Sequence, residues 1–227
     1  MFYFDPLYLV FIAPALLLAI WAQYRVRATY AEASQVPAPL SGAAAARHVL
    51  DTAGLYDVGV EITEGFLSDH YDPRDRVLRL SPEVYHERSM AAVGIAAHEA
   101  GPALQHAEAY APLVVRNAAV PVANFGSSLG MLVLLVGLAM ALKPLIWAGI
   151  ALFAGVVFFQ VVNLPVEFNA STRARQQLAA LGIVDPQGMQ YVSRVLNAAA
   201  LTYVAATLQA ILTLLYYILR ASSRRDE

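Results

Sequence analysis

The sequence predicts a mainly α-helical, polytopic membrane protein with about four transmembrane helices and a small α/β subdomain on its cytoplasmic side. Hydrophobic residues make up 59% of the 227 residues, whereas a soluble domain is nearer half apolar. Four uncharged stretches are long enough to cross a hydrocarbon core, which takes roughly 20 helical residues. A single sizeable polar region separates the first of these stretches from the second.

The predicted spans are residues 6–24, 117–142, 144–166 and 195–219. The first could instead be a cleaved signal peptide. It follows Asp5 rather than a basic region, however, and has no small-residue cleavage site before Arg25. We therefore expect it to remain as an anchor in one domain over residues 1–227.

The basic residues predict which side of the membrane each loop occupies. Most of the fifteen Lys and Arg residues lie between the first two spans or in residues 167–194, and four crossings put these segments on one side. Because basic residues are retained in the cytoplasm, that side is expected to be cytoplasmic. Four basic residues fall on the opposite side: Lys143, Arg220, Arg224 and Arg225. If the last stretch does not fully cross, the tail returns to the cytoplasm.

The polar region, residues 25–110, is predicted to contain both helices and strands. Ser41 suits the N-cap of a helix over residues 43–52, and Gly54 suits its end. Residues 58–63 alternate apolar and polar side chains, as in a strand. Turn-forming residues at 71–75 precede a second predicted strand at 77–80, so we expect these two strands to form a hairpin.

Composition excludes several kinds of site. The chain has no cysteine, so it can form neither a disulfide nor a thiolate metal site, and any metal must bind His, Asp or Glu. The net charge is −2, and no basic run carries interleaved aromatic residues. The sequence therefore predicts no nucleic-acid partner.

A helix predicted from Ser89 to about His106 carries the strongest motif. It reads His98, Glu99, Ala100, Gly101, Pro102, which is HExxH with proline in place of the last histidine. The complete motif works because residues four apart share a helix face. Two imidazoles then hold one zinc, and the intervening glutamate is the general base. In isolation, a His-Glu pair is most often an ordinary helical pair.

An acidic residue follows the third predicted span. Glu167 should emerge on the same side as His98 if the four-span topology holds. Catalytic zinc usually takes three protein ligands and leaves a fourth position for water. The segment 167–194 is thus a candidate source of another ligand, although an acid at a helix end is commonly just solvated.

Three separated blocks resemble the YugP-like membrane zinc metallopeptidases, which are similar in motif to the gluzincins. The blocks are residues 67–73 with Leu80 and Ser81, residues 97–99, and residues 164–167 with Ala170, Ser171, Arg173 and Ala174. The resemblance implies a metallopeptidase-like subdomain that binds zinc through the motif histidines and the downstream glutamate. Carried over, His98 and Glu167 would be metal ligands and Glu99 the catalytic base.

Pro102 departs from this pattern because it has no metal-binding atom. It also costs the helix roughly 3 kcal/mol and is expected to kink it beside His98. His106 does not replace it, since eight helical residues separate the two histidines by about 12 Å along the axis, whereas zinc to nitrogen bonds are about 2.0–2.1 Å. Either an active enzyme has been substituted or a natural member has lost full zinc binding. The retention of Glu99 and Glu167 favours the first explanation.

Three further residues are candidates for positioning ligands or substrate. Ser171 could donate a hydrogen bond to a side chain that ligates the metal, or it could simply face water. His70 could orient substrate or be structural. Arg173 could pair with a carboxylate, or its place could reflect retention of basic residues in the cytoplasm alone.

Together these features predict a multi-pass metalloendopeptidase of the cell membrane, with its site facing the cytoplasm. Zinc would be its cofactor and a membrane-proximal peptide or protein its substrate, aligned by strand addition near residues 78–80. Because of Pro102, this form is expected to be inactive or impaired, with weakened zinc binding. The alternative is a non-catalytic scaffold or binding protein that retains the fold. A small transporter is disfavoured, since no span has an ionisable residue in its middle.

Overall fold

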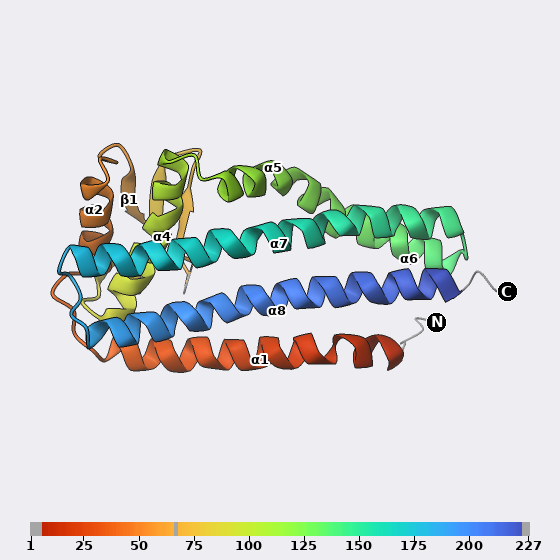
Figure 1. Ribbon diagram of the computed structural model, residues 1–227, viewed down its shortest axis with the longest axis horizontal. Helices are drawn as coiled ribbons and strands as arrows, with labels where there is room; N and C mark the ends of the chain where they lie inside the picture. Colours follow the sequence, from red (N-terminus) through yellow and green to blue (C-terminus); the bar gives the residue numbers. More distant parts are fainter. Residues whose placement is uncertain (1–5, 66–67, 224–227) are drawn as a thin grey trace. The chain divides into compact units, whose positions relative to one another are not determined.

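The computed structural model describes residues 6–65 and 68–223 (Figure 1). Leu67, Arg224 and Arg225, which entered the sequence predictions, lie outside these residues. The chain divides into two compact units. Unit 1 contains Met1–Trp21, Val114–Leu164 and Leu201–Glu227, and unit 2 contains Ala22–Leu113 and Pro165–Ala200.

Four helical segments are long and apolar enough to cross a membrane. They are α1 (Pro6–Ser34), the run formed by α5 (Ala111–Phe125), η1 (Gly126–Gly130) and α6 (Met131–Ala139), α7 (Lys143–Ala180) and α8 (Gly188–Ser223). Only 11–28% of the residues in their apolar windows are buried, as expected for side chains that face lipid rather than a protein core. The prediction of a mainly α fold with four candidate spans and a small α/β portion is confirmed.

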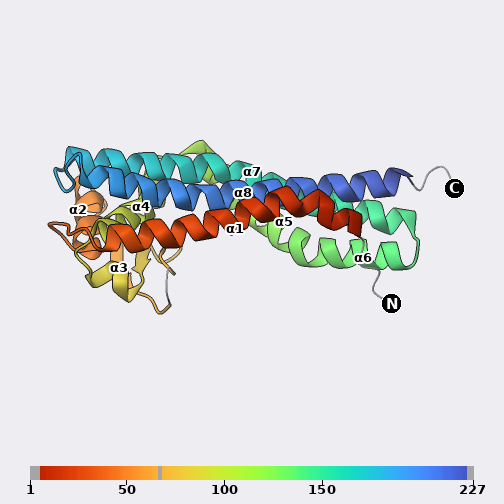
Figure 2. The same ribbon diagram turned by 90° about the horizontal axis from the view of Figure 1, so that it is seen from below.

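In unit 1, glycines allow α6 to approach the first half of α7. A Cβ atom built at Gly149 would lie 2.6 Å from the Cα of Leu134, and one built at Gly137 would lie 2.7 Å from the amide nitrogen of Ile146. The two helices run side by side in both views (Figures 1 and 2). Small residues of this kind let membrane helices pack through their backbones.

In unit 2, helix α4 (Met90–Ala107) packs against α2 (Gly42–Thr52) and α3 (Pro82–His86), as Figure 2 shows. Ser41 and Ser89 cap α2 and α4 by accepting hydrogen bonds from Ala44 N (3.3 Å) and Ala92 N (3.2 Å). Gly54, at φ +73°, follows the end of α2. The predicted boundaries of these helices are therefore confirmed. Helix α4 continues without interruption through Pro102.

The sheet of unit 2 differs from the predicted hairpin. It contains β1 (Gly59–Ile62), β2 (His70–Asp72) and β3 (Val77–Leu80) in the order β1-β3-β2. The two predicted strands, β1 and β3, pair in parallel, and the hairpin joins β2 to β3 instead. Strand β2 was not predicted, because its three residues show no apolar alternation. Two of them, Tyr71 and Asp72, were wrongly assigned to the turn. The predicted strand addition near residues 78–80 is also wrong, because β3 is central and already pairs along both edges.

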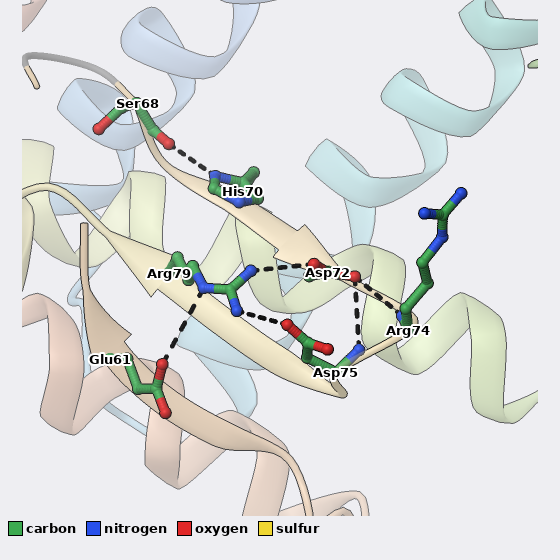
Figure 3. A network of polar contacts seen from close by, with 7 residues as sticks. All are labelled: Glu61, Ser68, His70, Asp72, Arg74, Asp75 and Arg79. Carbon is green, nitrogen blue, oxygen red and sulfur yellow. Dashed lines mark hydrogen bonds and ion pairs between the residues drawn. The ribbon is translucent and has the colours of Figure 1, made fainter. Parts of the chain in front are cut away.

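A polar network joins the three strands (Figure 3). The guanidinium of Arg79 donates to Asp72 Oδ2 at 2.9 Å and to Asp75 Oδ2 at 2.7 Å, and it lies 4.0 Å from Glu61 Oε2. Exposed ion pairs contribute at most about 1 kcal/mol each. The network therefore links the three short strands but adds little to the free energy of unfolding.

Candidate metal centre

Helix α4 and the second half of α7 cross with almost no space between their backbones. A Cβ atom built at Gly101 would lie 2.9 Å from the Cβ and 3.0 Å from the Cα of Ala170. A larger residue than glycine would force the helices apart. The crossing therefore brings neighbouring side chains of α4 within reach of those on α7.

His98 lies at this crossing and contacts two residues of α7. Its Nε2 atom is 3.3 Å from Glu167 Oε2, and its Nδ1 atom is 3.2 Å from Ser171 Oγ. Glu167 and Ser171 are four residues apart and hence share a helix face. The exposed fraction is 8% for His98 and 4% for Ser171, so the contacts form away from bulk water.

Opposing effects act on the pKa of His98. Burial disfavours the charged imidazolium, but the hydrogen bond to Glu167 and the negative charges of Glu99 and Glu167 outweigh it, and the pKa is raised. The carboxylates therefore make the imidazole an electron-rich, proton-attracting group. The negative electrostatic potential of these carboxylates would also favour a bound cation.

Glu99 follows His98 on α4 and is only partly exposed. Removal from water raises the pKa of its carboxyl to about 7, with further increases from the charges of Glu167 and Asp69, while the charge of His98 opposes the shift. A carboxyl group with a pKa near 7 exchanges a proton readily at neutral pH.

Asp69, directly before β2, is a further carboxylate whose charge acts on Glu99. Its Oδ1 atom accepts hydrogen bonds from Ser81 N at 2.8 Å and from Ser81 Oγ at 3.1 Å. Burial raises the pKa of Asp69, and the bonds from Ser81 oppose the increase. Asp69 is thus held in a fixed place within the electrostatic reach of Glu99.

The other predicted residues lie away from the His98–Glu167 pair. His70 is exposed at the start of β2, and its Nδ1 atom is 2.8 Å from Ser68 O (Figure 3). Arg173 forms a forked ion pair with Glu108, with distances of 2.7 and 2.6 Å.

The His98–Glu167 pair fits two ligands of one zinc ion. Two donors with bonds of about 2.0–2.1 Å in a tetrahedral site lie about 3.3–3.4 Å apart, and the observed separation is 3.3 Å. The third donor of the motif would come from position 102, where proline has none. No group of three or more His, Asp or Glu side chains within residues 6–65 and 68–223 is placed to hold a metal.

Two polar residues beside the pair, Gln105 and Asn169, were not predicted from the sequence. Gln105 is fully buried, and its Nε2 atom donates to Val166 O and Asn169 Oδ1, both at 2.9 Å. Its position seven residues after His98 puts it on the same helix face. The available signal was a polar residue on the same helix face as His98.

Residues 8–222 match the family described as "Putative neutral zinc metallopeptidase". The chain belongs to this family. It is also 47% identical over 215 residues to "Putative membrane protease YugP" of Bacillus subtilis (strain 168), covering 94% of this chain and 96% of that protein. No solved structure matches the chain.

Membership of the neutral zinc metallopeptidase family confirms the resemblance found in the sequence. It supports a protease-like hydrolytic function and implies zinc. With four apolar helices, the relationship to a membrane protease is consistent with a multi-pass membrane protein.

Proposed function

We propose that this chain is a membrane-embedded zinc metalloendopeptidase that is impaired because its zinc site lacks one ligand. The proposal rests on the buried contact of 3.3 Å between His98 Nε2 on α4 and Glu167 Oε2 on α7. Pro102 occupies the position on α4 where the motif has its second histidine. A paired imidazole and carboxylate at a ligand-ligand spacing suit zinc. Two donors hold zinc less tightly than the usual three.

Each side chain of the site has a distinct role in this proposal. His98 and Glu167 hold the metal, and Ser171 fixes the imidazole through its other nitrogen, as partners of ligating histidines do. Zinc, when bound in such sites, activates water and polarises a carbonyl group. Glu99 is the base, and its pKa of about 7 suits it to accept a proton at neutral pH and release it later.

Pro102 weakens this arrangement in two ways. It supplies no donor atom, and it has no backbone N–H for the carbonyl of His98 one turn earlier. The first effect removes a ligand. The second leaves the turn that carries His98 less firmly held. Both effects predict low zinc occupancy and little or no cleavage by the chain as it stands.

The proposed substrate is a peptide or protein segment close to the cytoplasmic face of the membrane. The concentration of basic residues before the second span and after the third supports this orientation. The edge strands of the sheet are β1 and β2. Because β2 also contacts α4, the helix that carries His98, an extended peptide would pair with β2.

Proteolysis by purified full-length protein in detergent tests the proposal. Three proteins are compared with zinc present: the parent chain, Pro102→His, and Pro102→His with Glu99→Gln. We expect cleavage of unstructured peptides by Pro102→His, and a rate lower by about 10²–10⁴-fold when the base is removed. Both proteins should hold zinc equally, since Glu99 is not a ligand in this proposal.

A second candidate function is a non-catalytic scaffold that keeps the metallopeptidase fold to bind a partner. It is favoured by the absence of a three-donor metal cluster among the residues that the structure describes. The same experiment separates the two functions. A Pro102→His protein that binds zinc fully, cleaves nothing and is unaffected by Glu99→Gln would establish the scaffold instead of the peptidase.

A further inference from the structure

Gln105 is a buried polar residue with an unusual pair of partners. Its side chain has an exposed fraction of 0%. Its amide nitrogen donates to Val166 O and to Asn169 Oδ1, each at 2.9 Å. These two acceptors lie on either side of Glu167 in the sequence. A single side chain of α4 therefore holds the turn of α7 that carries Glu167.

The contact continues as a chain of hydrogen bonds back to α4. Asn169 Oδ1 also accepts from Arg173 Nε at 2.7 Å, and the guanidinium of Arg173 is paired through both terminal nitrogens with Glu108. Glu108 is the residue that directly follows the end of α4. The network thus links α4 and the residue at its end to residues 166–173 of α7 at two points.

The turn that carries Glu167 needs such support. Pro165 lies inside α7 and cannot donate a hydrogen bond to the carbonyl four residues earlier, which weakens the helix at that turn. A ligand must be held within about 0.5 Å of its productive position by the residues around it. An amide in the helix crossing can supply this restraint where the helix itself does not.

We propose that Gln105 is a positioning residue that sets the distance between the carboxylate of Glu167 and the imidazole of His98. The inference deepens the proposed function and rests on it, because it takes Glu167 to be a metal ligand. Burying an amide in a helix crossing is costly unless its hydrogen bonds are made. The nitrogen of Gln105 makes two, whereas its Oε1 atom is buried without a hydrogen-bond partner in the described part of the chain. The side chain therefore retains a cost of burial, which a positioning role would explain.

A double-mutant cycle on zinc affinity tests the inference. The full-length Pro102→His protein is the reference, and Gln105→Met and Glu167→Gln are added singly and together. Methionine keeps most of the volume but cannot donate a hydrogen bond. We expect Gln105→Met to weaken zinc binding by about 10-fold, as removal of a group that orients a ligand does. Once Glu167 is Gln, the same change should have an effect of less than about 2-fold.

Val93→Ala is the matched control, because Val93 is equally buried on α4 and its truncation leaves a cavity without removing a side-chain hydrogen bond. Thermal unfolding of each protein shows whether its fold is intact. We expect Val93→Ala to lower stability and leave zinc affinity unchanged. If Gln105→Met does not fold, Asn169→Ala replaces it in the cycle, with a loss of affinity expected only while Glu167 is present.

The outcomes separate the inference from the proposed function. If Gln105→Met weakens zinc equally with and without the Glu167 carboxylate, or if Val93→Ala weakens it as much, the positioning role is refuted and the proposed function stands. If Pro102→His binds zinc no more tightly than the parent chain, the proposed function fails, and the inference fails with it.

Discussion

The imidazole of His98 and the carboxylate of Glu167 meet at 3.3 Å, although they come from different helices and from distant parts of the sequence. The contact exists because Gly101 lets α4 approach Ala170 of α7. It leaves the pair with two donors and a fixed spacing. Whatever restores a third donor at residue 102 should therefore act on a site that is already assembled.

Pro102→His should raise zinc affinity by at least about 10- to 100-fold, since adding a ligand should exceed the effect typical of a partner that only orients one. Pro102→Ala is the matched control, because it removes the proline without adding a donor. Alanine should raise helix stability by up to about 3 kcal/mol and leave zinc affinity near that of the parent. Competition with a chromogenic chelator measures both proteins. Equal affinities for the His and Ala variants would show that residue 102 is not a ligand position.

Ser171→Ala should weaken zinc binding by roughly 10-fold in the Pro102→His protein. The hydroxyl lies 3.2 Å from His98 Nδ1, and its loss frees the ring to rotate. Thr172→Ala is the neighbouring control, because its hydroxyl donates to Phe168 O within α7 instead. The same chelator competition applies to both. A loss of affinity in the Thr172 variant as large as in the Ser171 variant would point to a general disturbance of α7.

Glu99→Gln should stabilise the metal-free protein at neutral and alkaline pH but not at acidic pH. The folded-state pKa of about 7 lies above the ordinary value of 4.5, so the folded state favours the protonated carboxyl. The stability that this preference provides is complete below about pH 4.5 and is lost as pH rises toward 7. The neutral amide avoids the loss, which amounts to about 1–3 kcal/mol.

Thermal unfolding in detergent with a chelator, at several pH values, measures this difference. We expect the melting temperatures of parent and Glu99→Gln to coincide below about pH 4.5, to separate as pH rises toward 7, and to keep their full difference above pH 7. Glu64→Gln removes an exposed carboxylate and is the control for change of net charge. A constant difference across the pH range would contradict the buried, raised-pKa carboxyl.

Cysteine labelling tests the orientation in the membrane, and the chain suits it because it has no cysteine of its own. Gln35→Cys, Gln187→Cys and Lys143→Cys replace exposed residues. We expect the first two to react only when the cytoplasmic face is accessible and the third to react with an impermeant reagent added to intact cells. Labelling of Gln35→Cys and Gln187→Cys from opposite sides would refute the four-span topology.

Local features of this protein could be predicted well from the sequence. The caps at Ser41 and Ser89 and the α4 helix through His98 depend on residues a few positions apart. The apolar stretches of the four long helices depend on composition over about twenty residues. The family resemblance needed only three short blocks of residues and is confirmed.

Pairing between distant segments could not be predicted in the same way. Strand β2 is too short to show a periodic pattern, so the parallel pairing of β1 with β3 was mistaken for a hairpin. The partners of Arg173 were also open, since its charge fitted either a carboxylate or the membrane topology. Its ion pair with Glu108 depends on where α4 ends beside α7.

The sequence by itself determined which chemical groups are present: an HExxH-like helix, a downstream glutamate, no thiol, and proline where the second histidine would stand. Only the tertiary structure decided which of these groups meet. It placed Ser171 against the second nitrogen of His98 and Gln105 beside Glu167. The physical reason is that helix spacing arises from neighbouring residues, whereas contacts between helices depend on how closely backbones approach, here at Gly101 and Ala170.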